Sequence, residues 1–331
     1  MAASVVTHEK KADHQDFQAE KSKIWMDGVL VPYAQAQVHV LSHSLHYGSA
    51  AFEGVRAYRT HQNRTAIFRA QEHVQRLLRS MSILGGSVPF SEEAILQGMI
   101  DVINANDLRE CYLRPLAYFG PETKGLKLPI RSTMKLAIAA WPWGKYLGGD
   151  GGLEKGIRVK IASFRRPEVG NSLPWAKLSG NYLNSIMARR EASLAQVDEA
   201  ILLDQQGFVA EGSGENIFVV ARKKIYTPFA CNVLQGITRD SVMEIANHRG
   251  YEVVESMISR NQLYDADELF FTGTAAEITP IGEVDGYQIG NGKVGPLTRD
   301  IMEVFESCIR GHSDHWEEWL TYVDQKTKVG T

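Results

Sequence analysis

The sequence predicts an α+β fold made of two domains, and three observations lead to this prediction. The chain has 331 residues, about twice the usual length of a domain. Segments with strand and helix periodicity occur in both halves, without the strict strand–helix alternation of a parallel dinucleotide-binding sheet. Between the halves, residues 144–156 (GKYLGGDGGLEKG) contain six glycines, a composition typical of a linker.

These observations divide the chain into four parts. Residues 1–22 are polar with mixed charges, so we expect a flexible leader and neither a signal peptide nor a transit peptide. A small N-terminal α/β domain is expected at residues 23–143, and an interdomain loop at residues 144–156. A larger C-terminal domain is expected at residues 157–331.

Composition argues against several classes of protein. Lys and Arg total 36 against 39 for Asp and Glu, and this near balance gives no whole-chain attraction to nucleic acid or to an anionic membrane. No apolar run approaches the roughly 18 residues that a membrane-spanning helix needs. The cysteines, Cys111, Cys231 and Cys308, are far apart, which argues against a disulfide framework or a zinc site and favours a cytoplasmic protein.

In the first half, the residue patterns predict strands around two helices. Asp27-Gly28 predicts the turn of a hairpin at residues 24–31, because both central positions of such a turn favour positive φ. Apolar residues at helical spacing predict one helix around residues 74–84 and a second that follows a Ser91 N-cap. The other strands are expected at residues 54–59, 65–68, 111–118 and 134–141.

In the second half, the same criteria predict a mixed set of elements. They are a strand at 157–164, a helix at about 181–194, a hairpin of strands 200–203 and 208–220 that turns at 204–207, a helix at 238–247, strands at 251–257 and 268–272, and a helix at 297–309. Trp316 and Trp319 would share a helical face. We therefore expect a docking helix at the tail, and no metal patch formed with His312 and His315.

Lys177 is the first candidate for chemistry. It lies among apolar residues in SLPWAKLSGNYL, just before a predicted helix. Apolar surroundings lower the pKa of a lysine and make it a usable nucleophile or base, as a Schiff-base lysine requires. The alternative is a lysine whose stem covers apolar surface while its ammonium group reaches water.

Three other segments would suit an anionic or cofactor-like ligand. In FVAEGSGENIF, Glu211 ends a strand before small residues that allow close approach to a ligand, although an exposed strand-end glutamate would look the same. In LQGITRD, the first N–H groups of a predicted helix, at Ile237 and Thr238, would suit a phosphate. In FFTGTAAEITPI, residues 272–274 offer hydroxyls and close backbone, or form a plain turn.

Two further patterns have polar side chains on one face. His39, His43 and His46 could share a helix face as metal ligands, but no carboxylate lies between them, so we expect no metal. Tyr112 and Arg114 alternate on a predicted strand and so point to the same side. They would suit the carboxylate of a ligand or simply face solvent.

Together these segments resemble the branched-chain amino acid aminotransferases, within the fold-type-IV pyridoxal-phosphate enzymes. The motifs that carry the resemblance are HVLSHSLHYGSAAFEGVR, YLRP, AKLSGNYLNS, GFVAEGSGENIF, LQGITRD and GTAAEITP. Their order and spacing agree from about residue 24 to residue 322. The resemblance implies the fold-type-IV aminotransferase fold, pyridoxal 5'-phosphate bound by the C-terminal domain, and a homodimer that in some relatives builds hexamers.

The resemblance also implies roles in cofactor binding. Lys177 matches the lysine that holds the cofactor covalently, and Glu211 matches the glutamate that faces its pyridine nitrogen. Tyr182 matches the tyrosine near the 3-hydroxyl. The positions that match the phosphate site are Arg76, Ile237, Thr238 and Thr274.

Substrate-binding positions follow in the same way. Tyr112 and the backbone of Thr274, Ala275 and Ala276 match the site for the α-carboxylate. The wall around the substrate side chain matches Tyr47, Phe52, Gly54, Trp143 and Tyr146. In this pattern Arg114 and Tyr47 would admit the distal carboxylate of glutamate or 2-oxoglutarate.

The implied reaction is ping-pong transfer of the amino group of L-leucine, L-isoleucine or L-valine to 2-oxoglutarate. An apolar pocket separates these side chains by only about 1–3 kcal/mol per methylene, so all three should be accepted. Residues 121–133 match the family poorly, so a D-amino acid or (R)-amine transaminase, or an aminodeoxychorismate-type lyase, remains an alternative. A catalytically idle relative would have lost Lys177 or Glu211, and both are present.

Overall fold

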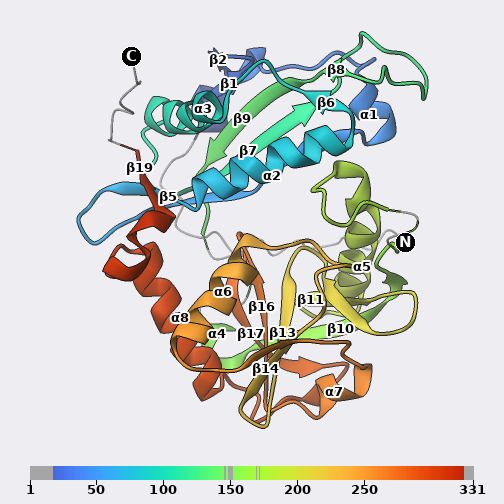
Figure 1. Ribbon diagram of the computed structural model, residues 1–331, viewed down its shortest axis with the longest axis vertical. Coiled ribbons are helices and arrows are strands. Elements are labelled where there is room, and N and C mark those ends of the chain that lie inside the picture. Colours follow the sequence, from blue (N-terminus) through green and yellow to red (C-terminus); the bar gives the residue numbers. More distant parts are fainter. Residues whose placement is uncertain (1–17, 145–146, 148–151, 169, 171, 324–331) are drawn as a thin grey trace, which may run out of the picture.

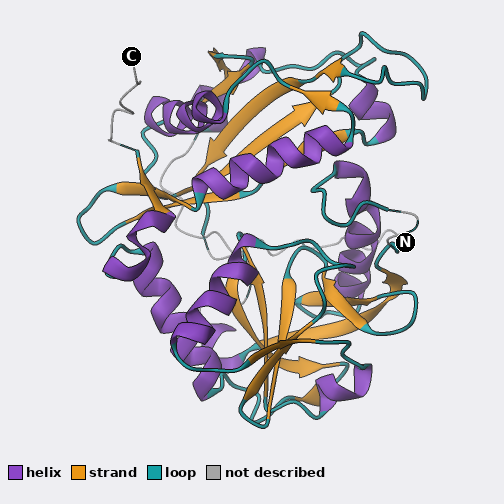
Figure 2. Cartoon of the chain, viewed as in Figure 1, coloured by secondary structure: helices purple, strands orange, loops and turns teal. Residues whose placement is uncertain are grey.

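The computed structural model describes residues 18–144, 147, 152–168, 170 and 172–323. Each half of the chain forms a large β-sheet with helices packed against it (Figures 1 and 2). This arrangement confirms the predicted α+β class. Among the described residues, no helix has both the length and the apolar character needed to cross a bilayer.

The first sheet has eight strands, and all of its pairs are antiparallel. In spatial order they are β19 (Leu320–Tyr322), β5 (Thr65–Phe68), β4 (Val55–Arg59), β7 (Cys111–Tyr118), β9 (Lys135–Trp141), β1 (Lys23–Met26) and β2 (Val29–Pro32), and β3 (Ala50–Phe52) also pairs with β7. Helices α2 (Ala70–Ile83) and α3 (Glu92–Ala105) pack against each other and against this sheet.

The two helices form where the sequence predicts them. Ser91 accepts a hydrogen bond from the backbone N–H of Ala94 at 3.2 Å, which confirms the predicted N-cap of α3. One turn of α3 approaches β1 closely, because a Cβ on Gly98 would lie 2.9 Å from the indole of Trp25. Apolar residues of both helices are buried with those of the sheet in a single core.

The second sheet has nine strands and is mixed. In spatial order they are β12 (Val209–Gly212), β11 (Glu199–Leu203), β10 (Ile157–Arg165), β17 (Glu277–Val284), β16 (Glu268–Gly273), β13 (Asn216–Ala221), β14 (Lys224–Thr227) and β15 (Val253–Glu255), and β18 (Tyr287–Gln288) pairs with β17. Helix α5 (Leu183–Leu194) packs on β10 and β11, and helices α6 (Ile237–His248) and α8 (Pro296–Ile309) pack together beside β16.

Short elements complete the described part of the chain. They are α1 (His43–Tyr47), α4 (Gly152–Lys155), α7 (Arg260–Tyr264), β6 (Gly86–Ser87), β8 (Ser132–Thr133) and the 3-10 helices Ala19–Lys21, Tyr33–Gln35, Ser179–Tyr182 and Asp314–Trp319.

The predicted strand at residues 208–220 is wrong as a single strand. It is divided into β12, which pairs with β11 as predicted, and β13, which pairs with β16. The chain leaves one strand neighbour and joins another within the small residues that follow Glu211. The structure also contains strands that the periodicity did not predict, among them β14 and the eight-residue β17.

The C-terminal tail also differs from its prediction. The tail is a 3-10 helix followed by a strand, and not the expected docking helix. Although residues 157–331 were expected in one domain, Leu320 pairs with Phe68, so the tail returns to the first sheet. The expected interdomain loop contains α4, and its residues 145–146 and 148–151 lie outside the described residues, as do residues 1–17 of the leader.

Trp319 anchors this returning segment. Its ring lies 5.7 Å from that of Phe68 and 5.3 Å from that of Trp316, and its carbonyl accepts a 2.6 Å hydrogen bond from the Arg69 N–H. The side chain is buried, so its interactions join the C-terminal segment to the edge of the first sheet and to the start of α2.

We expect Trp319→Ala to lower the free energy of unfolding by about 3–5 kcal/mol, because truncating a buried indole removes apolar burial and leaves a cavity. Equilibrium urea unfolding measures the change. Tyr287→Ala, which truncates an exposed aromatic ring, is the control and should change the value by less than about 1 kcal/mol. Equal losses in both variants would show that the C-terminal segment is not an anchor.

Candidate active site

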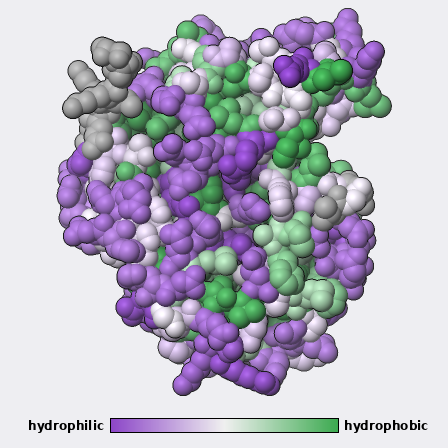
Figure 3. Space-filling view, viewed as in Figure 1, coloured by the Kyte–Doolittle hydropathy of each residue, from purple (hydrophilic) through white to green (hydrophobic). Residues whose placement is uncertain are grey.

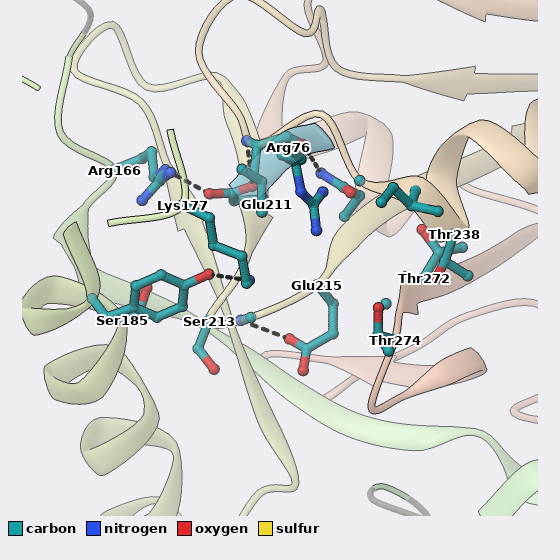
Figure 4. A pocket seen from close by; sticks show the side chains of 17 residues that line it. Arg76, Arg166, Lys177, Ser185, Glu211, Ser213, Glu215, Thr238, Thr272 and Thr274 are labelled. Atoms are coloured by element: carbon teal, nitrogen blue, oxygen red, sulfur yellow. Dashed lines mark hydrogen bonds and ion pairs between the residues drawn. The ribbon is translucent and has the colours of Figure 1, made fainter. Parts of the chain in front are cut away.

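An open cavity, with about 480 Å³ of empty space that includes part of the open solvent, is lined by residues from both halves of the chain (Figure 4). Helix α2 contributes Arg76, and the remaining lining residues come from the second half. All seven residues predicted to bind a cofactor lie in its wall: Arg76, Lys177, Tyr182, Glu211, Ile237, Thr238 and Thr274.

Lys177 is held on both sides of its backbone. Its N–H donates to the Ser80 hydroxyl of α2 at 3.0 Å, and its carbonyl accepts from the N–H of Phe52 at 3.0 Å. The side-chain Nζ donates to the Tyr182 hydroxyl at 2.6 Å and lies 4.9 Å from the centre of the Phe52 ring. A half-buried amine on a fixed backbone is thus presented to the cavity, as a nucleophile or base requires.

Glu211 is buried where β12 ends. Its Oε1 lies 2.5 Å from Nε of Arg166, and its Oε2 accepts from the N–H of Leu234 at 3.2 Å. Burial raises the pKa of Glu211, while Arg166 and the Leu234 N–H act in the opposite direction. The carboxyl group is therefore fixed in direction, and a cationic nitrogen in the cavity would stabilise its ionised form.

Other residues of the cavity lining provide the donors that an anion needs. Helix α6 begins at Ile237 and no described side chain caps it, so its first N–H groups face the lining. Gly236 precedes it, where a Cβ would overlap the Asn216 amide oxygen. The Thr272 hydroxyl is fully buried with no hydrogen-bond partner among the described residues. Together with Arg76, these groups fit a phosphate.

The predicted substrate residues adjoin Lys177 on the first-sheet side. The Phe52 ring lies 4.9 Å from that of Tyr182 and 4.9 Å from the Arg114 guanidinium. Arg114 donates to the Tyr112 hydroxyl at 3.3 Å. Gly54 is required beside them, because a Cβ at that position would overlap the same hydroxyl.

Other predicted substrate residues lie farther out. The ring of Trp143 packs 5.1 Å from that of Tyr112, whereas Tyr47 lies on α1 and is 47% exposed. Ala275 and Ala276 form the turn between β16 and β17. The cavity lining itself contains none of the predicted substrate residues described here, which are Tyr47, Phe52, Gly54, Tyr112, Arg114, Trp143, Ala275 and Ala276. Tyr146 lies outside the described residues.

The histidines considered as metal ligands have other partners. His43 Nδ1 lies 2.6 Å from the Ser49 hydroxyl, and His46 Nε2 lies 2.9 Å from the Val40 carbonyl. The described part of the chain contains no group of three His, Cys, Asp or Glu side chains arranged for a metal.

Sequence reasoning missed two charged residues in the lining, Arg166 and Glu215. Arg166 follows β10 directly in SFRRP, and this position at the end of a strand is the signal that could have identified it. Glu215 is buried, and burial together with the neighbouring Glu199 raises its pKa to about 8. No local pattern distinguishes it from a solvent-exposed glutamate.

Comparison with known proteins identifies the family to which this chain belongs. Residues 50–284, most of the chain, match the family described as amino-transferase class IV. The chain belongs to the class IV aminotransferases. This family uses pyridoxal 5'-phosphate, and the phosphate donors, Lys177 and Glu211 are the groups that such a cofactor needs.

Relatives of this class IV aminotransferase match it over nearly their whole length. The branched-chain-amino-acid aminotransferase of Pseudomonas aeruginosa is 45% identical and is aligned over 91% of this chain and 97% of its own. The solved branched-chain amino acid aminotransferase of Escherichia coli has a TM-score of 0.89 and 40% identity and covers 92% of this chain and 100% of its own. The Thermoproteus uzoniensis enzyme with norvaline has a TM-score of 0.85 and 43% identity, covering 91% and 99%.

A further solved relative carries a ligand that joins the cofactor to an amino acid. It is a branched-chain amino acid aminotransferase complexed with N-(5'-phosphopyridoxyl)-L-glutamate. Its TM-score is 0.88 at 43% identity, and the match covers 93% of this chain and 100% of that one.

We expect Gly54→Ala in this aminotransferase to displace Tyr112 and to lower kcat/KM for the amino acid at least about tenfold, mainly through KM. Steady-state kinetics measures this, and an unchanged cofactor absorbance band would show that the cofactor site is intact. Gly170→Ala places a methyl group in open space and is the matched control. Normal kinetics in Gly54→Ala would contradict the assigned role of Tyr112.

Proposed function

We propose that this protein is a branched-chain amino acid aminotransferase. In this proposal it moves the amino group of L-leucine, L-isoleucine or L-valine to 2-oxoglutarate, which gives branched-chain 2-oxo acids and L-glutamate. The observation that carries the proposal is the shared cavity, in which Lys177 and Glu211 lie with the phosphate donors of Arg76 and α6. The names of the similar proteins support the choice of amino acids.

Pyridoxal 5'-phosphate, when bound, supplies an electron sink for the carbanion that forms when an amino acid loses its Cα proton. Glu211 would hold the pyridine nitrogen in its protonated form, because a buried carboxylate stabilises a cation beside it. Lys177 Nζ would accept the Cα proton and deliver it to the C4′ carbon of the cofactor, so it would serve as base and then as acid. Tyr182 orients Nζ through their 2.6 Å hydrogen bond.

The substrate side of the site suits amino acids with an apolar side chain and also acids with a second, distal carboxylate. Phe52 and Trp143 supply apolar surface, and Tyr112 with the turn at residues 274–276 would bind the α-carboxylate. Arg114, with Tyr47, would receive the distal carboxylate of glutamate or 2-oxoglutarate. The relative complexed with a phosphopyridoxyl derivative of glutamate and the Thermoproteus uzoniensis complex with norvaline support a pocket that accepts both.

A homodimer, or a larger assembly built from dimers, is part of the proposal. Apolar side chains are exposed along residues 38–47 and on the first turns of α5, including Val40, Leu45, Leu183 and Ile186. A hydrogen bond from Gly180 to the Gly48 carbonyl brings these segments side by side, and Figure 3 shows hydrophobic residues on this side of the molecule. Contiguous apolar surface of this kind favours a second copy. The free cysteines favour a cytoplasmic location.

The test of the reaction is an absorbance spectrum before and after adding L-leucine without an acceptor. We expect the visible band of the bound cofactor to move to the shorter wavelength of its amine form, and 2-oxoglutarate to restore it. Lys177→Ala is the control: it should bind the cofactor only non-covalently and show no turnover.

The other outcomes separate the alternatives. An absorbance band that does not shift with L-leucine but shifts with D-alanine or an (R)-amine would support transamination and overturn the choice of substrate. Release of ammonia or pyruvate without an acceptor would indicate a lyase. Full-rate transamination by Lys177→Ala would overturn the role of Lys177.

We expect sedimentation equilibrium to give a dimer or a multiple of it, and Leu45→Glu to weaken the assembly at least about tenfold by burying a charge at the interface. Met257→Glu changes an equally exposed apolar residue away from this surface and should leave the mass unchanged. A monomeric wild-type protein with full activity would contradict the proposal.

A further inference from the structure

A buried ion pair with a third partner lies directly behind the proposed phosphate site. Glu53, His73 and Arg76 are 0%, 1% and 5% exposed. Arg76 donates from Nε and from one terminal nitrogen to the two oxygens of Glu53, at 2.7 and 2.8 Å, and His73 Nδ1 lies 2.8 Å from Glu53 Oε2. This geometry bears on the phosphate role of Arg76, so the inference rests on the proposed function.

The hydrogen bonds that Arg76 makes within the protein determine which of its N–H groups remain available to a ligand. A guanidinium has five N–H groups in one plane. Two go to Glu53, and the other terminal nitrogen donates to the Gln235 carbonyl at 2.8 Å. Among the described residues these are its hydrogen bonds, so one N–H is left on each terminal nitrogen. Such a pair matches two oxygens of a phosphate.

Glu53 remains ionised in this site. Burial alone would raise its pKa, but the charge and hydrogen bonds of Arg76 and the bond to His73 hold the pKa well below its usual range. An ionised carboxylate only accepts hydrogen bonds, so His73 donates from Nδ1. Burial lowers the pKa of His73, which favours the neutral ring. The neutral ring therefore orients Glu53 without competing as a second cation with Arg76 for this carboxylate.

We propose that Glu53, oriented by His73, is a positioning residue that aims Arg76 at the phosphate of the cofactor. Without Glu53 the guanidinium would lose the two bonds that fix its plane and its rotation. Arg76 would also be left as a buried charge with no carboxylate partner, an unfavourable state that promotes its movement. Glu53 itself is held from the first sheet, since its N–H donates to the Pro115 carbonyl at 2.8 Å.

The experiment compares two ligands that differ only in the phosphate. Full-length protein freed of cofactor is titrated with pyridoxal 5'-phosphate and with pyridoxal, and the affinity ratio is read from the absorbance of the bound forms. We expect Glu53→Gln to lower the ratio at least tenfold while the affinity for pyridoxal changes less than about twofold. His73→Gln should lower this affinity ratio by a smaller factor. It replaces Glu53→Gln as the test variant if Glu53→Gln does not fold.

Two controls separate the causes of a negative result. Glu268→Gln alters another buried glutamate, which accepts hydrogen bonds from the start of α8, and should leave the ratio unchanged. Arg76→Gln should lower the ratio if Arg76 binds the phosphate. A normal ratio in both Glu53→Gln and His73→Gln, with a low ratio in Arg76→Gln, would overturn the positioning role alone. A normal ratio in Arg76→Gln would overturn the phosphate site on which it rests.

Discussion

The site depends on the contact that helix α2 makes with both halves of the chain. At its start, Arg69 donates to the Asp240 carboxylate at 2.7 Å and to the Ser241 hydroxyl at 3.0 Å, both on α6. Arg76 reaches the Gln235 carbonyl just before α6, and the Ser80 hydroxyl accepts the Lys177 N–H. One rigid element thus sets the distance between the proposed phosphate donors and Lys177. Because effective positioning is worth several kcal/mol in catalysis, a shift of α2 would affect every step at once.

The charges around the cavity occur as partnered groups, and this has an energetic reason. A buried guanidinium or carboxylate without a partner costs several kcal/mol, whereas a hydrogen-bonded pair offsets much of that cost. Arg166 with Glu211, and Arg76 with Glu53, are such pairs. Neither pair is strong evidence for stability of the fold. Each fixes the direction of a charged group, and direction is what a bound cofactor requires.

The sequence predicts the local part of this structure well and the non-local part poorly. The bounds of β5 and β7 and the Ser91 cap follow from residues that are neighbours along the chain. The seven predicted cofactor residues do share a cavity. They were identified from motifs, because periodicity alone could not have placed them together. Pairing of β13 with β16 and of β19 with β5 joins segments far apart in sequence, and so does the contact of Glu53 with Arg76. A charged residue beside apolar neighbours looks exposed until its partner is known.

Glu211 and Glu215 show how the break between β12 and β13 serves the chemistry. The break places both carboxyl groups in the lining, and burial raises the pKa of each. Glu215, with a pKa of about 8, holds a proton below that pH, so it adds no full negative charge near the phosphate donors. Glu211 differs because Arg166 already opposes its protonation, and a pyridinium beside it would oppose protonation further. A cationic ring beside Glu211 would therefore stabilise its ionised form further, whereas burial and the neighbouring Glu199 favour the protonated form of Glu215. Two glutamates four residues apart thus have different partners, and these partners favour different protonation states.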